Sequence, residues 1–171
     1  MEIKLSRLED SLLDSALEIY LEAFPPDERR PWKSILSPDD IAGPRLQGIF
    51  ADGRLVGMVT TWAFDNFTYV EHLALSTSTR GQGIGSKVVA ALKASSAVPL
   101  LLEVEPRHLS DQAARRIGFY ARAGFDVIDT GYVQPPYSPH LSPVALWLMA
   151  SGRVDPDKAA ATLHSRVYRA V

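Results

Sequence analysis

Apolar and polar positions alternate along several short stretches of the chain, a pattern that predicts β-strands. One longer stretch, residues 43–64, predicts a hairpin because the turn dipeptide Asp52-Gly53 divides it into two strands. Residues 66–75 are largely apolar on both faces, which is typical of a buried strand at the centre of a sheet. The remaining predicted strands are residues 2–8, 99–105, 125–133 and 144–150.

Between these strands, apolar residues recur at the three- to four-residue spacing that predicts helices. Helical spacing runs through residues 12–24, and the segment 25–32 breaks it with prolines and begins a second short helix. Gly124 suits the carboxyl end of a helix, and Asp155-Pro156 suits the start of one. The later helices are predicted at residues 84–92, 111–123 and 155–167. The order of elements is therefore β-α-α-β-β-β-α-β-α-β-β-α, which indicates an α/β class of fold.

Composition narrows the classes of function. A net charge of −2 over 171 residues gives no electrostatic reason to expect nucleic acid or a membrane surface as a partner. The chain has no cysteine, which excludes disulfides, thiolate nucleophiles and cysteine metal sites, and its four histidines lack metal-ligand spacing. No apolar run approaches the roughly 20 residues that span a bilayer, and the amino terminus does not resemble a signal peptide. We therefore expect a cytoplasmic protein without a metal.

Three alternating glycines, Gly81, Gly83 and Gly85, stand directly after Arg80, between a predicted strand and a predicted helix. The unpaired N–H groups at a helix amino terminus bind anions, and glycines let a phosphate approach the backbone closely. Several such N–H groups facing one concavity fit a diphosphate better than a single phosphate. The pattern GxxxxGK[ST] is absent, and the dinucleotide pattern GxGxxG lacks its last glycine. The alternative is a glycine turn that holds no ligand.

The segment LALSTSTRGQGIGSKVV, residues 73–89, resembles the acetyl-CoA signature of the GNAT acyltransferases. Arg80, Gly83 and Gly85 fill the positions that define this signature. A second segment, RIGFYARAGFDVI at residues 116–128, resembles the later Phe-Tyr-x-x-x-Gly-Phe motif of the same family. The two motifs together, in this order and at this separation, indicate the family more specifically than either does alone.

The resemblance covers about residues 1–150 and implies a GNAT-like acyl-CoA N-acyltransferase fold, with a mixed, mostly antiparallel central sheet of about six to seven strands flanked by helices. We expect residues 1–150 to form a single domain, and residues 151–171 to be a helical extension of it that is either an appendage or a dimer element. The loop 105–114 lacks an asparagine that the family often carries there. The resemblance places acetyl-CoA against Leu73, Ala74, Leu75, Arg80, Gly81, Gln82, Gly83, Ile84, Gly85 and Ser86.

The activity that the resemblance implies is transfer of an acetyl group from acetyl-CoA to a primary amine, of a small molecule, peptide or protein, by direct attack in a ternary complex. Glu71 is the candidate base, because family members often carry a base two residues before the position of Leu73. We expect burial in an apolar row of the strand to raise the pKa of Glu71. That row is Phe67, Tyr69, Glu71, Leu73 and Leu75. The alternative is a structural glutamate paired with an arginine or a backbone amide.

Other residues of this region have expected roles as well. His72 is expected on the opposite face, with Val70 and Ala74, as a core histidine whose hydrogen bonds are satisfied. Tyr120 is the candidate acid, because the family places this hydroxyl near the CoA sulfur, and the alternative is a packed core aromatic. By analogy with the family, a backbone N–H near Leu73–Leu75 stabilises the oxyanion.

The acceptor side is the least specified part of the sequence. Arg29 and Trp32 belong to a charged segment that shapes the acceptor pocket in such proteins, Tyr137 flanks a proline-rich loop, and Glu103 can bind a cationic amine. The alternatives are a solvated loop, a packed tryptophan and a strand-edge glutamate. Two other functions stay open: a non-catalytic acyl-CoA-binding regulatory module on the same fold, and a nucleotide-phosphate binder that shares only the loop. The protein is expected to be a monomer or a homodimer.

Overall fold

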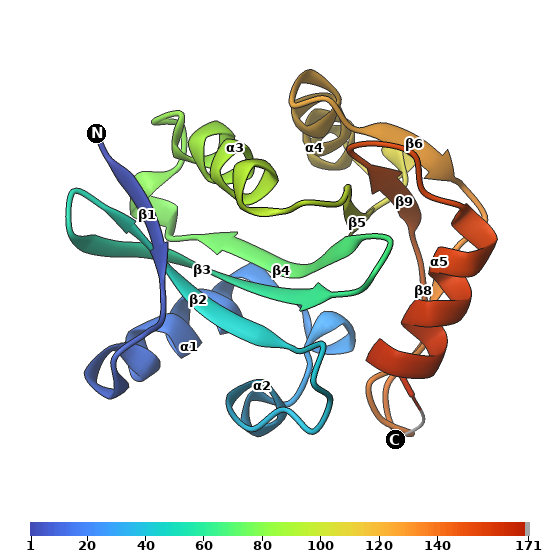
Figure 1. Ribbon diagram of the computed structural model, residues 1–171, viewed down its shortest axis with the longest axis horizontal. Helices are drawn as coiled ribbons and strands as arrows, with labels where there is room; N and C mark the ends of the chain where they lie inside the picture. The colour runs from blue at the N-terminus through green and yellow to red at the C-terminus, as the bar shows by residue number, and fades with distance from the viewer. Residues whose placement is uncertain (170–171) are drawn as a thin grey trace.

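Seven strands form one mixed sheet in the order β1-β2-β3-β4-β5-β9-β6. Its neighbouring strands are antiparallel, except that β4 and β5 run parallel. The computed structural model, which describes residues 1–169, thus confirms the mixed, mostly antiparallel sheet (Figure 1). The strands are β1 (Ile3–Ser6), β2 (Arg45–Ala51), β3 (Arg54–Ala63), β4 (Thr68–Leu75), β5 (Leu100–Val104), β6 (Asp126–Asp129) and β9 (Trp147–Ala150).

Helices cover both faces of this sheet, as Figure 1 shows, with α3 and α4 on one side and α1 and α2 on the other. The first pair buries Val88 and Ile117 against the sheet, and α1 buries Ala16 and Tyr20 on the opposite face. The last helix lies beside β9 and β8 and ends in a single π-helical turn, η5. The helices are α1 (Leu13–Ala23), α2 (Trp32–Leu36), α3 (Ile84–Ser95), α4 (Asp111–Arg122), α5 (Pro156–Thr162) and η5 (Leu163–Val167).

Three predicted elements have different bounds in the structure. The predicted strand 125–133 is divided into β6 and β7 (Val133–Gln134), with a turn at Gly131 whose N–H is held by the Asp129 side chain. The predicted strand 144–150 is likewise divided into β8 (Val144–Ala145) and β9, and β7 and β8 pair with each other in a separate ribbon. The second helix starts only at Trp32, after a short 3₁₀ turn.

Strand β4 contains a bulge at Glu71, which the alternation of its sequence does not reveal. Thr60 of β3 pairs with His72, and the next residue, Thr61, pairs with Val70, so that Glu71 is skipped. An extra residue in one strand reverses the alternation of faces beyond it. The predicted single row is therefore wrong, and so is the placement of Val70 beside His72. One face carries Phe67, Tyr69, His72 and Ala74, and the face toward α3 carries Val70, Leu73 and Leu75.

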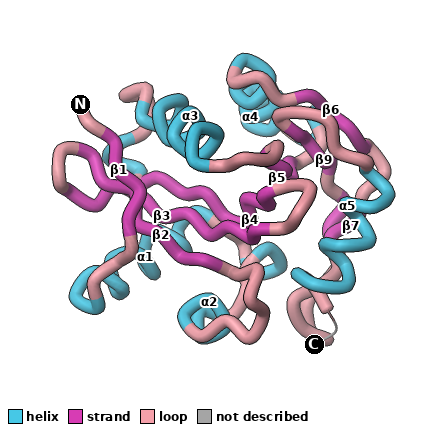
Figure 2. The backbone as a smooth tube through the Cα atoms, viewed as in Figure 1, coloured by secondary structure: helices cyan, strands magenta, loops and turns pink. Residues whose placement is uncertain are grey.

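Strands β4 and β5 pair over only part of their length. Thr68–Val70 pair with Leu100–Leu102, and from Glu71 onward the two strands diverge. Figure 2 shows strands β1 to β4 on one side of this divergence and β5, β9 and β6 on the other. Backbone N–H and C=O groups on the diverging edge of β4 lack the ladder bonds that a paired strand would give them. The divergence therefore opens a gap in the sheet whose wall offers backbone hydrogen bonds.

Within residues 1–169, no helix is both long enough and apolar enough to cross a membrane. The same residues bring together no group of three or more His, Cys, Asp or Glu side chains that could hold a metal ion. The expected extension 151–171 includes residues 170–171, which lie outside the described part of the chain.

Candidate active site

A groove of about 530 Å³ passes through the gap between β4 and β5. Arg80 and Gly85 line it near the start of α3, Tyr120 lines it from α4, and Glu103 lines it from β5. The predicted residues in its wall are Glu71, Leu73, Ala74, Leu75, Arg80, Gly85, Glu103 and Tyr120. The structure therefore gathers residues from the predicted cofactor set, the catalytic set and the acceptor set around one groove.

The glycine segment forms the turn that starts α3. Gly81 and Gly83 have φ angles of 77° and 72°, a left-handed conformation that residues with a Cβ rarely adopt. A Cβ built on either residue would meet no heavy atom of the described chain within 4 Å, so the backbone conformation rather than crowding requires glycine. Since the turn carries no side-chain cap among the described residues, the first amides of α3 are free to bind an anion beside Arg80.

Three other residues of the predicted cofactor set take different positions around this turn. Ile84 is buried in the apolar core, so its side chain cannot face a ligand and only its backbone can contribute. Gln82 is exposed, and its side-chain amide donates to the carbonyl of Ser78 at 3.2 Å. Ser86 is exposed on the first turn of α3.

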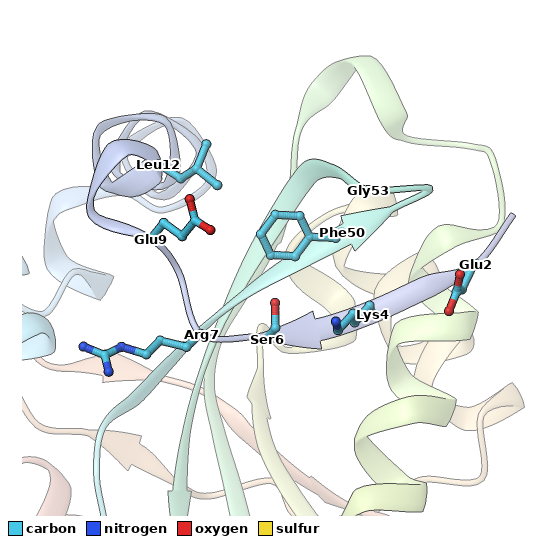
Figure 3. A pocket seen from close by; sticks show the side chains of 8 residues that line it. All are labelled: Glu2, Lys4, Ser6, Arg7, Glu9, Leu12, Phe50 and Gly53. Atoms are coloured by element: carbon cyan, nitrogen blue, oxygen red, sulfur yellow. The ribbon is translucent and has the colours of Figure 1, made fainter.

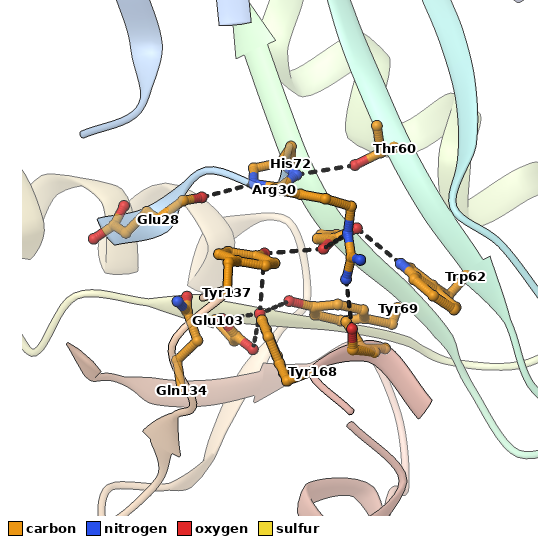
Figure 4. Close-up of polar contacts among 12 residues, drawn as sticks. Glu28, Arg30, Thr60, Trp62, Tyr69, His72, Glu103, Gln134, Tyr137 and Tyr168 are labelled. Carbon is orange, nitrogen blue, oxygen red and sulfur yellow. Dashed lines mark hydrogen bonds and ion pairs between the residues drawn. The ribbon is translucent and has the colours of Figure 1, made fainter. Parts of the chain in front are cut away.

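Glu71 is held as a buried, fully paired carboxylate. Its Oε1 accepts from Arg30 Nε at 2.8 Å and from the Tyr137 hydroxyl at 2.9 Å, and its Oε2 accepts from Trp62 Nε1 at 2.8 Å (Figure 4). Burial by itself raises the pKa of Glu71, but the charge of Arg30 and the hydrogen bond from Trp62 outweigh burial and leave the pKa below its ordinary value. The expectation of a raised pKa is therefore wrong, because the strand bulge places Glu71 against a cation.

Glu103 differs from Glu71 in that tyrosine hydroxyls, and not an arginine, surround its carboxylate. Its Oε1 accepts from the Tyr132 hydroxyl at 2.9 Å and from the Tyr168 hydroxyl at 2.8 Å. Its Oε2 lies 3.0 Å from the Tyr168 hydroxyl, and Figure 4 shows Tyr168 beside Glu103. Within the described chain, no cation lies within ion-pair distance of this carboxylate. Burial raises the pKa of Glu103 to about 7, although the hydrogen bonds from Tyr168 and Tyr132 lower it in part. Glu103 is thus a carboxyl group that titrates near neutral pH.

Glu103 also lies where two hollows meet. A small hollow of about 60 Å³ on the α1 side is lined by Phe24, Glu28, Glu103 and Tyr137, among others. Phe24, Glu71, Glu103 and Arg116 line both this hollow and the groove between β4 and β5. A carboxylate with spare lone pairs therefore lies between the groove that contains the glycine turn and the small hollow.

His72 is satisfied in the core, as expected from the sequence. Its Nε2 lies 2.8 Å from the carbonyl of Glu28, so that nitrogen carries the proton, and its Nδ1 lies 3.2 Å from the Thr60 hydroxyl (Figure 4). Burial lowers the pKa of His72 below its ordinary value. A neutral ring with both nitrogens occupied is not placed to exchange protons with a substrate.

Tyr120 packs on α4 with its ring edge-on to Phe125, at 5.4 Å between ring centroids. Its hydroxyl has no hydrogen-bond partner among residues 1–169, and the side chain lines the groove. Burial raises the pKa of Tyr120, so the hydroxyl is protonated at neutral pH. The protonated hydroxyl is therefore placed to donate a proton toward the groove.

Of the four predicted acceptor residues, two lie at the site and two do not. Arg29 donates to the carbonyls of Phe24 and Leu21, at 2.6 and 2.8 Å, and so holds the end of α1 rather than facing the groove. Trp32 packs against Tyr20, with 5.5 Å between ring centroids, in the core under α1. Tyr137 and Glu103 do lie at the site, since both line the small hollow.

Sequence reasoning missed several residues that hold this site together. Arg30, next to the predicted Arg29, reaches Glu71, and its guanidinium lies 5.2 Å from the Trp62 ring centroid and 5.1 Å from that of Tyr137. No signal in the sequence separates the two neighbouring arginines. The other missed members are Trp62, Tyr69, Tyr132 and Tyr168, which resemble ordinary core aromatics in their sequence patterns.

Another hollow of about 520 Å³ lies away from this site, between β1, the β2–β3 hairpin and the start of α1 (Figure 3). Lys4 and Arg7 stand there with Glu2 and Glu9, and Phe50 and Leu12 form the apolar part of its wall. None of the predicted cofactor, catalytic or acceptor residues lines this hollow. It shares no lining residue with the groove between β4 and β5, so it has no part in the chemistry described above.

Comparison with known proteins identifies the family. Residues 46–127 match the family model described as an acetyltransferase (GNAT) domain. A solved structure from Bacteroides thetaiotaomicron, assigned to the GNAT acetyltransferases, is 32% identical over 96% of this chain and 98% of that one, with a TM-score of 0.86. The chain belongs to the GNAT acetyltransferases. This family assignment and the observed sheet together confirm the resemblance that the two motifs carried.

Of two further relatives of this GNAT protein, one matches a smaller part of the chain and the other is less similar in sequence. YjbC of Bacillus subtilis (strain 168), assigned as an acetyltransferase, is 44% identical over 63 residues, which are 36% of this chain. The match spans about a third of that relative, 32% of its length. Naa50 of Arabidopsis thaliana, solved with the bisubstrate analogue CoA-Ac-MVNAL, has a TM-score of 0.62 at 18% identity, covering 90% of this chain and 100% of that one. That likeness supports the fold alone.

Proposed function

We propose that this GNAT protein is an N-acetyltransferase that moves the acetyl group of acetyl-CoA to a primary amine by direct attack in a ternary complex. The observation that carries the proposal is a single groove that joins the uncapped glycine turn at Arg80, the Tyr120 hydroxyl and the Glu103 carboxylate. Naa50 of Arabidopsis thaliana, which shares the fold, was solved with the bisubstrate analogue CoA-Ac-MVNAL, and by analogy of fold we infer a site that binds donor and acceptor together.

Glu103 replaces Glu71 as the proposed base. Two carboxylates whose surroundings separate their pKa values take different roles, and here Glu71 is fixed as an anion by Arg30 while Glu103 titrates at about 7. A base with a pKa near the working pH removes a proton most efficiently. Glu103 therefore takes the proton of the attacking amine, and Glu71 anchors the wall of the site.

The other groups complete the transfer. The nitrogen of the amine forms the new bond to the acetyl carbon, and the carbon–sulfur bond of the thioester breaks. Backbone N–H groups on the diverging edge of β4 donate to the oxyanion that forms between these steps. Tyr120 gives its proton to the departing thiolate and regains one from solvent, while the proton that Glu103 accepted returns to solvent. The sum of the steps is one amide and one free thiol.

A panel of amines tests the proposal. Free thiol released from acetyl-CoA is followed in the presence of polyamines, aminoglycosides, amino acids and amino-terminal peptides, and the product is checked for an acetylated nitrogen by mass spectrometry. We expect release that depends on at least one class of amine. If calorimetry detects acetyl-CoA binding but no amine raises thiol release above its background, the protein is a non-catalytic acyl-CoA-binding module instead.

The Arg80→Ala variant should weaken the donor site selectively. We expect the KM for acetyl-CoA to rise by about tenfold with little change in kcat, because one charge-assisted hydrogen bond to phosphate contributes about 1.5 kcal/mol or more. Arg54, another exposed arginine, stands at the start of β3, and the matched control Arg54→Ala should leave this KM unchanged. An unchanged KM for acetyl-CoA in Arg80→Ala would contradict a role for Arg80 in binding the diphosphate of coenzyme A.

A further inference from the structure

The carboxy-terminal segment, from α5 through Tyr168, packs against the site from outside the residues that match the family model, 46–127. Leu163, Val167 and Tyr168 are buried, at 0%, 3% and 4% exposure, in the same cluster as Trp62 and Tyr69. The carbonyl of Val167 accepts a hydrogen bond from the guanidinium of Arg30. The segment is therefore part of the wall behind the two carboxylates.

Contacts with residues outside the site also hold the carboxy-terminal segment in place. Arg166 makes a two-pronged contact with Asp40, from Nε to Oδ2 at 2.9 Å and from Nη2 to Oδ1 at 2.7 Å. The His164 ring lies within 3.0 Å of the Val133 carbonyl, at the β7–β8 ribbon. The contacts of Val167, Arg166 and His164 hold the backbone next to Tyr168 in place. The fold therefore fixes the direction of the Tyr168 side chain.

While Glu103 is ionised, the hydroxyl protons of Tyr168 and Tyr69 have one consistent arrangement. Each tyrosine hydroxyl carries one proton, and a carboxylate can only accept. Tyr168 lies 2.8 Å from Oε1 and 3.0 Å from Oε2 of Glu103, so its proton points at that carboxylate. The Tyr69 hydroxyl, 2.8 Å from that of Tyr168, must then donate to it (Figure 4). Tyr168 thus links the Tyr69 hydroxyl to Glu103 through hydrogen bonds, and its own hydroxyl contacts both oxygens of that carboxylate.

We infer that Tyr168 is a positioning residue of the acetyl-transfer site: its hydroxyl fixes the Glu103 carboxylate in the orientation and ionisation state that proton removal requires. The inference rests on the proposed function, in which Glu103 is the base. It gives the carboxy-terminal segment a role in the reaction, in addition to the appendage or dimer contact expected from the sequence. Tyr168 touches neither substrate in this account and acts only through Glu103.

The charged and titratable groups around Glu103 come from every element packed on it. Tyr69 and Glu71 face it from β4, Tyr132 and Tyr137 from the segment after β6, and Tyr168 from the carboxy-terminal segment. The hollow on its other side is lined by Glu28, His72, Glu105 and Arg116. Among these groups, the hydrogen bond from Tyr168 favours the ionised form of Glu103 more than any other. Its removal therefore raises the pKa of Glu103.

The Tyr168→Phe variant tests this inference because it keeps the ring and removes only the hydroxyl. We expect the acid limb of the kcat/KM profile to move upward by about one pH unit, with the KM for acetyl-CoA unchanged. The same shift should appear in a carbon-13 titration of the glutamate carboxyls, in which Glu103 is assigned by its absence from Glu103→Gln. Tyr20→Phe removes another buried hydroxyl, one that lies near His72. It should change neither the acid limb of the profile nor the titration of Glu103.

Two outcomes decide the inference. If the Glu103 resonance titrates at the same pH in Tyr168→Phe and in the wild-type protein, the positioning role is overturned, even if activity falls. If the resonance shifts upward in Tyr168→Phe but not in Tyr20→Phe, the role stands. A wild-type protein without amine-dependent thiol release would overturn the proposed function, while the titration would still show whether Tyr168 controls the ionisation of Glu103.

Discussion

We expect the Glu103→Gln variant to lose about 10²–10⁴-fold in kcat/KM for amine-dependent thiol release, the usual contribution of a positioned general base. Glutamine keeps the size of the side chain and can still accept hydrogen bonds from Tyr132 and Tyr168. It cannot take a proton at neutral pH. The loss should therefore appear mainly in kcat, while calorimetric binding of acetyl-CoA stays close to that of the wild-type protein.

Glu105→Gln is the matched control for this loss. Glu105 lies just beyond the end of β5 and lines the small hollow but not the groove that carries Tyr120 and Arg80. We expect Glu105→Gln to keep kcat near the wild-type value. Equal losses in both variants would mean that charge in the hollow, rather than a base at Glu103, supports the reaction.

The second large effect concerns stability. The Arg30→Met variant should lower the free energy of unfolding at pH 7 by about 3–5 kcal/mol, because it leaves the Glu71 carboxylate buried without its counter-ion. The side chain of Glu71 is 0% exposed and that of Arg30 is 13% exposed, so water cannot replace the lost partner. Urea unfolding followed by fluorescence of the three tryptophans measures the change.

The pH dependence of that loss has a definite sign. Glu71 has a lowered pKa in the wild-type protein, so its contribution to stability is present above the ordinary pKa of a glutamate and disappears as the pH falls. In Arg30→Met, the deficit relative to wild type should therefore shrink toward low pH. Arg166→Met breaks an ion pair whose arginine is 42% exposed and should destabilise far less. Equal losses in the two variants would contradict a structural role for the Arg30–Glu71 pair.

Much of the fold could be predicted from the sequence because each element carries a local signal. The turn at Asp52-Gly53, the helix that follows Gly83 and the helix end at Gly124 all need backbone conformations that few residues allow, and all three lie where expected. The breaks in the two divided strands were not predictable. The two segments pair with each other on both sides of the break, and only β9 also pairs with β5, so the division depends on long-range pairing.

The candidate site could be predicted only where motifs fix the backbone. Arg80, Gly85 and Tyr120 lie at the groove because the chain order of strand, glycine turn and helix places them there. The bulge at Glu71 was not predictable, since a period of two assumes an unbroken ladder. It turned Glu71 toward Arg30, whose part in the site depends on a contact 41 residues away along the chain. The role of Tyr168 likewise depends on a partner 65 residues away.

The role of Glu103 as the base is tested most sharply by the pH dependence of kcat/KM for amine-dependent thiol release by the wild-type protein, from about pH 5 to 9. With Glu103 as the base, log kcat/KM should rise with a slope of one and level off at about pH 7, where Glu103 loses its proton. Deprotonation of an alkyl amine in solution would instead place that limb near pH 10. A profile that shows no limb near pH 7, in a wild-type protein that does release thiol, would contradict Glu103 as the base.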